Sequence, residues 1–292
     1  IASYDPIIKI NLFKKEIFIE GSELKDINRY KKLINTIDKK ALKNNQKLEF
    51  DFSGINLNKT SQIFKENIKK IKNLISIGDI FQANLTTKCE IKAKENYCFL
   101  DIYLKIRNKL RAPFGGIIIN NLEAKEGVLC TSPERFLKID KKGLVETRPI
   151  KGTRPRNKNK EKDAFNAIEL ITNEKDRAEN IMIVDLMRND LNKVCETGSV
   201  MVPELLKLES YLKVHHLTSV VKGKLKKNKN WIDLLIACWP GGSITGAPKI
   251  RSCQRLFELE GFERGPYCGS FLKINWNGEF DSNILIRSFI IK

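Results

Sequence analysis

An α+β fold, with mainly antiparallel sheets packed as a sandwich and helices outside, is the class that the 292-residue sequence predicts. Alternating apolar residues indicate several short strands, as at Ile8, Ile10 and Leu12. Long amphipathic stretches interrupt these strands without the regular β-α-β alternation of a parallel sheet. A chain of this length can bury a sizeable core, as one large domain or as two lobes.

The composition excludes several classes of protein. Hydrophobic residues make up 41% and charged residues 30% of the chain, as in ordinary soluble proteins, and no apolar run approaches the ~20 residues of a membrane span. The sequence has no signal peptide, and its seven cysteines form no CxxC pair, which favours reduced thiols in the cytoplasm. The net charge of +18 comes mostly from lysines scattered along predicted helix faces, so we expect no nucleic-acid partner.

The N-terminal elements follow from the spacing of apolar residues. A β-hairpin is predicted through Ile8–Leu12 and Ile17–Ile19, and a helix runs from Ser22 to Asn44-Asn45. After a short strand around Phe50 and Phe52, Thr60 is expected to cap a second helix that ends at Gly78. Alternation over Asp79–Thr86 predicts a strand with Gln82 on one face, where a glutamine is more often a hydrogen-bonding strand residue than a catalytic group.

The remaining elements alternate between helix and antiparallel strand. In chain order they are a helix from about Tyr97 to Leu110, a meander through Phe114–Ile119, Val128, Phe136 and Val145, a helical region from about Glu161 to Leu191, strands around Val200 and Leu212, a glycine-rich turn over Pro240–Lys249 that leads into a helix with Pro248 in its first turn, and strands at Tyr267–Ser270, Ile274–Trp276 and Ile284–Ile290.

The segment Glu146–Arg156 is the most informative for chemistry. Lys151 stands between an apolar strand residue and Gly152, so its amine is predicted where a sheet ends and the backbone opens. The Thr153 hydroxyl can hydrogen-bond an anion there. Three arginines are expected to surround the lysine, namely Arg148, Arg154 and Arg156. Nearby positive charge disfavours a protonated amine, which is one route to a nucleophilic lysine; the alternative is a basic turn on the surface of a basic protein.

Other polar residues are candidate acids or ligands. Glu134 precedes a predicted strand, as either an exposed edge charge or an active-site acid. Asp176 and Glu179 are three residues apart on a predicted helix, so they share a face that is either simply solvated or able to offer oxygens to a cation such as Mg²⁺. His215 and His216 are adjacent on a strand and point to opposite faces, so at most one faces a given pocket.

Seven segments taken together resemble the chorismate-utilising enzymes, and among them component I of the aminodeoxychorismate synthases. They occur in the family's order and cover most of the chain from about residue 68 onward. They are Gly78–Asn84, Ser132–Phe136, Pro149–Thr153, Lys175–Asn180 with Asp185–Asp190, His215–Leu217, Pro240–Arg251 and Ile286–Ser288.

The resemblance implies the same α+β architecture and a specific reaction. Chorismate and ammonia give 4-amino-4-deoxychorismate, for para-aminobenzoate and folate synthesis, with Mg²⁺ as cofactor and with ammonia from glutamine through a separate glutamine amidotransferase subunit. Salicylate and isochorismate synthases, which add water, carry a lysine base where Gln82 stands. Gln82 therefore indicates an enzyme that uses ammonia. Anthranilate synthases usually have alanine in place of Lys151, so Lys151 favours the aminodeoxychorismate enzymes.

The resemblance also implies a role for each matching residue. Lys151 would attack C2 of chorismate and expel the C4 hydroxyl, with Glu134 as the general acid, a role that needs a raised pKa. Glu179, with Asp176 near or behind it, would hold Mg²⁺. The implied substrate-binding residues are Gln82, Gly152, Thr153, His216, Thr245, Tyr267 and Arg287. Tyr267 and Arg287 would grip the enolpyruvyl carboxylate.

Two departures from the family pattern concern the ends of the chain. Family members continue past the Ile-Arg-Ser strand into a glycine-rich turn and an acidic helix that completes the metal site, and they have a larger N-terminal sheet region. We therefore expect residues 1–60 to be a remnant of that sheet region and residues 61–292 to be a chorismate-binding catalytic domain truncated at its C-terminus, weak or inactive by itself. The alternatives are anthranilate synthase component I, a nucleic-acid-binding module, and a catalytically incomplete chain that only docks the amidotransferase.

Overall fold

The chain divides into two compact units, Ile1–Leu48 and Glu49–Lys292. The computed structural model describes residues 4, 5, 7–11, 13–36, 50–51, 57–93, 98–110, 112–121 and 126–291. The first unit contains the antiparallel hairpin of β1 (Ile7–Asn11) and β2 (Glu16–Glu20), followed by α1 (Leu24–Thr36). The predicted hairpin is confirmed, and the predicted helix end at Asn44-Asn45 lies outside the described residues. The expected domain boundary at residue 60 stays a prediction.

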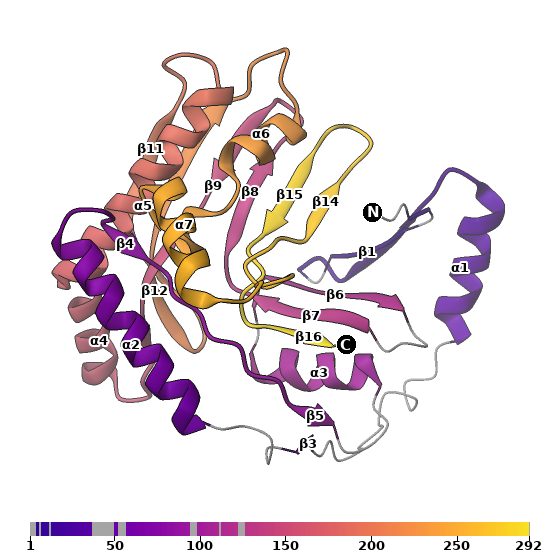
Figure 1. Ribbon diagram of the computed structural model, residues 1–292. Helices are drawn as coiled ribbons and strands as arrows, with labels where there is room; N and C mark the ends of the chain where they lie inside the picture. Colours follow the sequence, from indigo (N-terminus) through magenta and orange to yellow (C-terminus); the bar gives the residue numbers. More distant parts are fainter. Residues whose placement is uncertain are drawn as a thin grey trace. The chain divides into compact units, whose positions relative to one another are not determined.

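A seven-stranded sheet forms the centre of the second unit (Figure 1). Its strands are β8 (Arg135–Ile139), β9 (Leu144–Thr147), β10 (Ile150–Pro155), β11 (Met201–Ser210), β12 (Val214–Lys224), β14 (Leu272–Ile274) and β15 (Phe280–Asn283). The strand order is β10-β12-β9-β8-β15-β14, and β11 pairs with the other edge of β12. The first half of β12 pairs with β10 and its second half with β9, so this strand links the Lys151 segment to the rest of the sheet.

A second, three-stranded sheet is built from two strands that come before the large sheet in the chain and one that comes after it. It has the order β16-β7-β6 and is covered by α3 (Phe99–Lys109); its strands are β6 (Phe114–Asn121), β7 (Glu126–Ser132) and β16 (Ser288–Ile291). Two further pairs are short: β3 (Phe50–Asp51) with β5 (Lys92–Ala93), and β4 (Gln82–Ala83) with β13 (Gly246–Ala247). Every strand pair in the described parts of the chain is antiparallel, which confirms the predicted α+β class.

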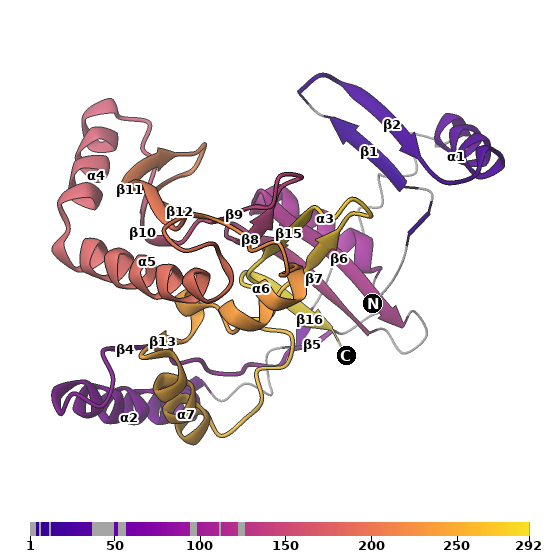
Figure 2. The same ribbon diagram turned by 90° about the horizontal axis from the view of Figure 1, so that it is seen from above.

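Helices cover the large sheet on the side that holds the main core. Figure 2 shows α4 (Lys160–Thr172) and α5 (Glu174–Val194) along the strands β10, β11 and β12. Apolar residues of α5 and of α6 (Trp231–Cys238) pack against apolar residues of the sheet. The fully buried side chains of this interface include Ile183 and Leu191 of α5, Leu234 of α6, and Val145, Val221 and Phe280 of the sheet. Burial of such side chains contributes about 1.5–3 kcal/mol each, so this interface fixes α5 against β12, the strand that pairs with β10.

The predicted helical region over Glu161–Leu191 consists of two helices, because Asn173 ends one and begins the next. Asn173 has an extended backbone with ψ 110, and its side chain accepts a hydrogen bond from the Asp176 N–H at 3.0 Å. An asparagine that caps a helix in this way satisfies one of the free N–H groups of the first turn. The cap therefore places Asp176 and Glu179 in the first two turns of α5.

Several predicted boundaries are wrong for local reasons. Helix α2 (Leu57–Ser76) starts before Thr60, which lies inside the helix instead of capping it. The strand predicted over Asp79–Thr86 is reduced to the two residues of β4, because its partner β13 is itself only two residues long. Two other predicted strand segments lie outside strands, Tyr267–Ser270 and the stretch Ile284–Arg287, whereas β11 and β12 begin one and two residues after Val200 and Leu212. Cys268 and Arg287, with positive φ of 66 and 50, interrupt the two segments that are not strands.

Helix α7 (Lys249–Glu260) lies beside α2, as both ribbon views show. The Asn67 side chain donates to the Leu259 carbonyl at 2.7 Å, and both Arg251 and Arg255 donate to the Asp79 carboxylate just after α2. These contacts hold the segment of Gln82 against the glycine-rich loop. All seven cysteines are free, and among the described helices none is both long and apolar enough to cross a membrane.

Candidate functional site

Glu134 lies in the short connection between β7 and β8 and is only 7% exposed. Its main chain is fixed, since its N–H donates to the Ser132 hydroxyl at 3.2 Å and its carbonyl accepts from the Ile284 N–H at 3.2 Å. Burial raises the pKa of Glu134 to about 7, although the Ser243 hydroxyl, the charge of Lys151 and the Ile150 N–H all favour the ionised form. A carboxyl near half protonation at neutral pH suits a general acid, and the reading of Glu134 as an exposed edge charge is wrong.

Lys151 occupies a β-bulge near the start of β10. The pairing of β10 with β12 shifts between Ile150 and Thr153, and Gly152 has a φ of 81, which few residues with a side chain adopt. The bulge directs the half-buried Lys151 amine to the Ser243 carbonyl, to which Nζ donates at 3.1 Å. The charge of Lys151 also acts on Glu134, so the predicted acid and the predicted nucleophile lie near each other.

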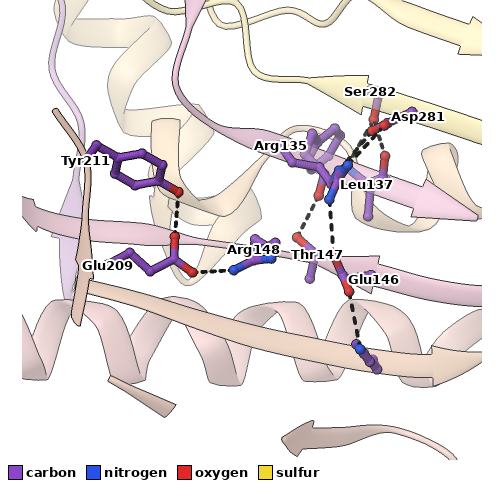
Figure 3. Close-up of polar contacts among 11 residues, drawn as sticks. Arg135, Leu137, Glu146, Thr147, Arg148, Glu209, Tyr211, Asp281 and Ser282 are labelled. Carbon is purple, nitrogen blue, oxygen red and sulfur yellow. Dashed lines mark hydrogen bonds and ion pairs between the residues drawn. The ribbon is translucent and has the colours of Figure 1, made fainter. Parts of the chain in front are cut away.

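The three arginines expected around Lys151 are each paired with carboxylates. Arg148 donates to Glu209, which also accepts from the Tyr211 hydroxyl at 2.6 Å (Figure 3). The other pairs are Arg154 with Glu169 and Asp176, and Arg156 with Asp163. Their charges are thus largely balanced where they lie. The acidic partners come from β11, α4 and α5, between 7 and 61 residues away in the sequence.

Thr153 of β10 and His216 of β12 lie opposite each other in the sheet and form a second polar pair. Thr153 Oγ1 and His216 Nδ1 are 2.8 Å apart. Burial and the nearby Arg287 lower the pKa of His216, so the ring is neutral at pH 7 and can exchange hydrogen bonds with a ligand. His215 points to the opposite face, where Ser210 and Asp163 contact its ring nitrogens at 2.7 and 3.1 Å. The predicted opposite orientation of the two histidines is confirmed.

Arg287 and Tyr267 come from neighbouring segments of main chain. The Cys268 N–H donates to the Leu285 carbonyl at 3.0 Å, and the Arg287 carbonyl accepts from the Thr131 N–H at 3.1 Å. Arg287 has a φ of 50, in the left-handed region that costs an arginine on the order of 1 kcal/mol or more. Such backbone strain concentrates at functional sites. The positive charge of Arg287 contributes to the lowered pKa of His216.

Gln82 lies beside the glycine-rich loop, close to Thr245. Residues 82 and 83 pair with residues 247 and 246, and the Asn84 N–H donates to the Thr245 carbonyl at 2.7 Å. The Gln82 Oε1 atom is buried and, within the described residues, has no hydrogen-bond partner. A buried acceptor of this kind costs about 1–3 kcal/mol unless a ligand or water donates to it, so it is suited to binding a polar group.

The two predicted metal ligands differ in their surroundings. Asp176 is paired with Arg154 at 3.0 Å, whereas Glu179 has only a 3.8 Å contact with Lys175. In the described part of the chain no cluster of three or more His, Cys, Asp or Glu side chains is arranged to hold a metal. Because Mg²⁺ often binds through one or two carboxylates together with waters and substrate, Glu179 fits as one ligand, with Asp176 behind it.

Gly152 on β10 and Gly242 in the glycine-rich loop both pack closely against α5. A Cβ atom on Gly152 would lie 2.9 Å from Asp176 Cγ, and one on Gly242 would lie 2.2 Å from Leu186 Cδ2. Two surface hollows, of about 420 and 460 Å³, lie elsewhere and are not lined by any predicted site residue. The candidate site is therefore defined by the convergence of Glu134, Lys151 and their neighbours. Ser243 was missed by sequence reasoning, although it stands within the Pro240–Lys249 motif.

The comparisons with known proteins agree on one family. Residues 2–292 match the family model described as chorismate binding enzyme. The chain is 42% identical over 233 residues to an Arabidopsis thaliana protein named aminodeoxychorismate synthase, chloroplastic, a match that covers 80% of this chain and 25% of that protein. It is 40% identical over 241 residues to anthranilate synthase component 1 of Bacillus subtilis, covering 82% of this chain and 46% of that protein.

The fold is also that of a solved relative. The crystal structure of anthranilate synthase component I from Streptococcus pneumoniae TIGR4 matches with a TM-score of 0.82 and 27% identity, covering 98% of this chain and 64% of that one. The chain spans a quarter of the length of the Arabidopsis relative and about half of the length of the Bacillus relative.

Proposed function

This chain belongs to the family of chorismate binding enzymes, and from that premise we propose that it converts chorismate and ammonia to 4-amino-4-deoxychorismate. The observation that carries the proposal is the buried Glu134 carboxyl near the Lys151 amine, which donates to the Ser243 carbonyl of the glycine-rich loop. A nucleophile next to an acid of matched pKa is what displacement of a hydroxyl group requires.

The proposed reaction proceeds by two displacements. The neutral Lys151 amine forms a bond to C2 of chorismate while the C4–O bond breaks, and Glu134 gives its proton to the departing hydroxyl, which leaves as water. Ammonia then forms a bond to C4 as the C2–N bond breaks, which releases the lysine. The ionised Glu134 is available to take up a proton from the added nitrogen.

The other predicted residues are proposed to hold chorismate and ammonia. Arg287 and Tyr267 bind the enolpyruvyl carboxylate, since a guanidinium can bind a carboxylate in a bidentate manner. Gly152, Thr153 and His216 line the substrate site next to them, and Thr245 completes it from the glycine-rich loop. The unpaired Gln82 Oε1 is suited to accept a hydrogen bond from ammonia.

Mg²⁺ is proposed as the cofactor. Glu179 would be one of its ligands, while Asp176, held by Arg154, would support the same turn of α5. The bound ion would supply positive charge for a substrate carboxylate. Glu134 and Lys151 perform the proton transfer and the bond formation described above.

A partner subunit is proposed as the source of ammonia. Several relatives are named component 1, which implies a second component. We propose that this partner is a glutamine amidotransferase. The proposal would be supported by a purified partner that confers use of glutamine on this chain.

Anthranilate synthase is the second candidate function, because identities to relatives of both names are nearly equal, at 42% and 40%. Lys151 is the residue that favours aminodeoxychorismate synthesis, since the resemblance gives anthranilate synthases alanine at that position.

The test compares the parent protein with Lys151→Ala and Lys151→Arg, and identifies the product from chorismate and ammonium by mass and ultraviolet absorbance. We expect 4-amino-4-deoxychorismate from the parent and a loss of at least ~100-fold in both variants, because neither residue can act as the nucleophile. Anthranilate as the product of the parent would contradict the proposal. Near-parent turnover by Lys151→Arg would remove the covalent role and leave the lysine as a carboxylate-binding cation.

A further inference from the structure

Arg264 follows α7 and uses every nitrogen of its guanidinium, which is mostly buried. Nη1 donates to the Ile244 carbonyl at 2.8 Å and to Cys268 Sγ at 3.5 Å, and Nη2 donates to the Asn84 carbonyl at 2.7 Å. Nε, at 2.8 Å, and Nη2 also donate to the Glu260 carboxylate. Each N–H donor of the side chain therefore has an acceptor.

The Asn84 and Ile244 carbonyls lie where the pairing of β4 with β13 ends. Only two residue pairs join these strands, and beyond them the Asn84 N–H donates to the Thr245 carbonyl at 2.7 Å. A two-stranded ladder this short has little stability of its own. Arg264 binds one carbonyl from each segment, so it holds the two together where their own hydrogen bonds stop.

The guanidinium is itself held by Glu260, the last residue of α7. The Glu260 side chain is only 3% exposed, and its Oε1 atom also accepts from the Thr86 N–H at 2.9 Å. A buried carboxylate needs such partners, because an unpaired charge in the interior is strongly unfavourable. Arg264 therefore joins α7, the glycine-rich loop and the segment that follows Gln82. A lysine, which lacks the planar fork of donors, cannot make all of these contacts.

We infer that Arg264 is a positioning residue that fixes Gln82 for ammonia, by holding the segment after Gln82 against the glycine-rich loop. Gln82 lies two residues before Asn84, and its buried Oε1 atom has no hydrogen-bond partner among the described residues. The inference rests on the proposed function for the role of Gln82 toward ammonia. Its geometric content, one guanidinium bridging two segments of the site, stands on the contacts alone.

The experiment measures hydrogen exchange by mass spectrometry in the ligand-free, full-length protein. The reporters are the Phe81 and Asn84 amides, which donate to the Ala247 and Thr245 carbonyls, both at 2.7 Å. Arg264→Lys keeps the charge but gives up the bridge, so exchange in the peptide that contains these amides should become about tenfold faster. The amides of β12 are the internal reference and should exchange as in the parent.

Arg156→Lys is the matched control. The Arg156 guanidinium also binds a carboxylate, that of Asp163, and a main-chain carbonyl, that of Tyr211 at 3.0 Å, and neither partner belongs to the segments that Arg264 holds. This variant should leave the exchange of the two reporter amides unchanged. Glu260→Gln weakens the anchor of the Arg264 guanidinium without removing it. It should give a smaller change in the same direction, and it serves if Arg264→Lys does not fold.

Steady-state rates test the consequence for the reaction. Chorismate consumption is measured against ammonium at saturating chorismate, and against chorismate at saturating ammonium. Arg264→Lys should raise the KM for ammonium about tenfold and change the KM for chorismate by less than about twofold, because Thr153 and His216 are held by the pairing of β10 with β12 instead. An arginine with a merely structural role would lower the amount of active protein, and thus the rate at every concentration, while both KM values stayed the same.

The inference and the proposed function can fail separately. Unchanged exchange at Phe81 and Asn84 in Arg264→Lys, or an equal acceleration in β12, would overturn the inference, and so would an equal rise in both KM values. The exchange measurement needs no turnover, and the KM comparison can be made for either product. Anthranilate as the product would overturn the proposed function and leave the inference standing.

Discussion

Glu134 combines burial with a position next to a cation, and its protonation links stability to pH. Its pKa rises from 4.5 to about 7 because burial penalises the carboxylate more than Ser243 and Lys151 stabilise it. A group whose pKa is raised by folding contributes stability that is complete below its unfolded pKa and is lost as the pH rises through its folded pKa. The loss for Glu134 should therefore develop between pH 4.5 and about pH 7.

We predict that Glu134→Gln, which cannot ionise, is spared this loss. The difference in free energy of unfolding, variant minus parent, should increase by roughly 3 kcal/mol from pH 4.5 to pH 7.5. Urea unfolding at several pH values measures this increase, and Glu263→Gln, at an exposed position, is the control. A constant difference between variant and parent across the range would mean that Glu134 ionises normally in the folded protein.

In the basic segment Arg148–Arg156, side chains of the same charge that are close in the sequence bind different kinds of group. Four positive side chains lie within nine residues, yet the three arginines each reach a carboxylate on another element while Lys151 reaches a backbone carbonyl. Only the lysine is left near the buried acid. The bulge at Gly152 produces this difference, because it changes the direction of Lys151 relative to its neighbours on β10.

The glycine-rich loop is the element on which the site depends most. We predict that Gly246→Ala destabilises the protein by about 3–5 kcal/mol, because a Cβ atom there would lie 2.1 Å from the Gln82 carbonyl oxygen and the backbone φ is 154. Gly261→Ala is the control. It has a φ of 67 with nothing within 4 Å, so it should cost only about 1–2 kcal/mol. Urea unfolding of both variants makes the comparison, and equal losses would show that β4 and β13 separate easily.

Elements set by local patterns were predictable from the sequence. The strands through Val128, Phe136 and Val145 follow from apolar alternation and stand where it predicts. The break at Asn173 also had a local indication, a capping residue three positions before Asp176, but the apolar stripe continues past it and concealed it. The length of the short strand β4 was not predictable, because it is set by how many residues of the glycine-rich loop pair with it.

Features that depend on distant segments were not predictable. Arg287 interrupts an apolar run that reads as one strand, and its left-handed conformation is imposed by the hydrogen bonds to Thr131 on β7. The contact of Lys151 with the Ser243 carbonyl requires two segments far apart in the sequence to meet. The matching motifs identified the residues of the site by resemblance, whereas the arginine pairs and this contact needed the fold.

At the scale of the molecule, the charge of +18 does not by itself define a partner. Arginines that bind carboxylates, as in the contacts of Arg135 with Asp281 and Glu146 in Figure 3, use part of this charge to join strands. The expectation that the chain binds no nucleic acid stays a prediction, and so does the effect of the chain ends on activity.

If a partner subunit releases ammonia from glutamine, the purified protein should accept ammonium as its nitrogen donor but not glutamine. With chorismate and an ammonium salt the full-length protein should form product, and with glutamine in place of ammonium the rate should fall at least ~100-fold, because glutamine hydrolysis belongs to the proposed amidotransferase. Product formation is followed by its ultraviolet absorbance, with the partner subunit added back as the positive control. Efficient use of glutamine by the chain alone would show that no partner is needed.

The central claim is that Lys151 forms a covalent bond to chorismate while Glu134 assists the loss of water. The most direct measurement is the mass of the protein after incubation with chorismate in the absence of ammonia, followed by proteolysis to locate the modified residue. The account predicts an added mass of chorismate less one water on the peptide that contains Lys151, lost again on addition of ammonium and absent from Lys151→Ala. Turnover of chorismate by the parent without any such adduct, under conditions where its formation should outpace release, would contradict the account.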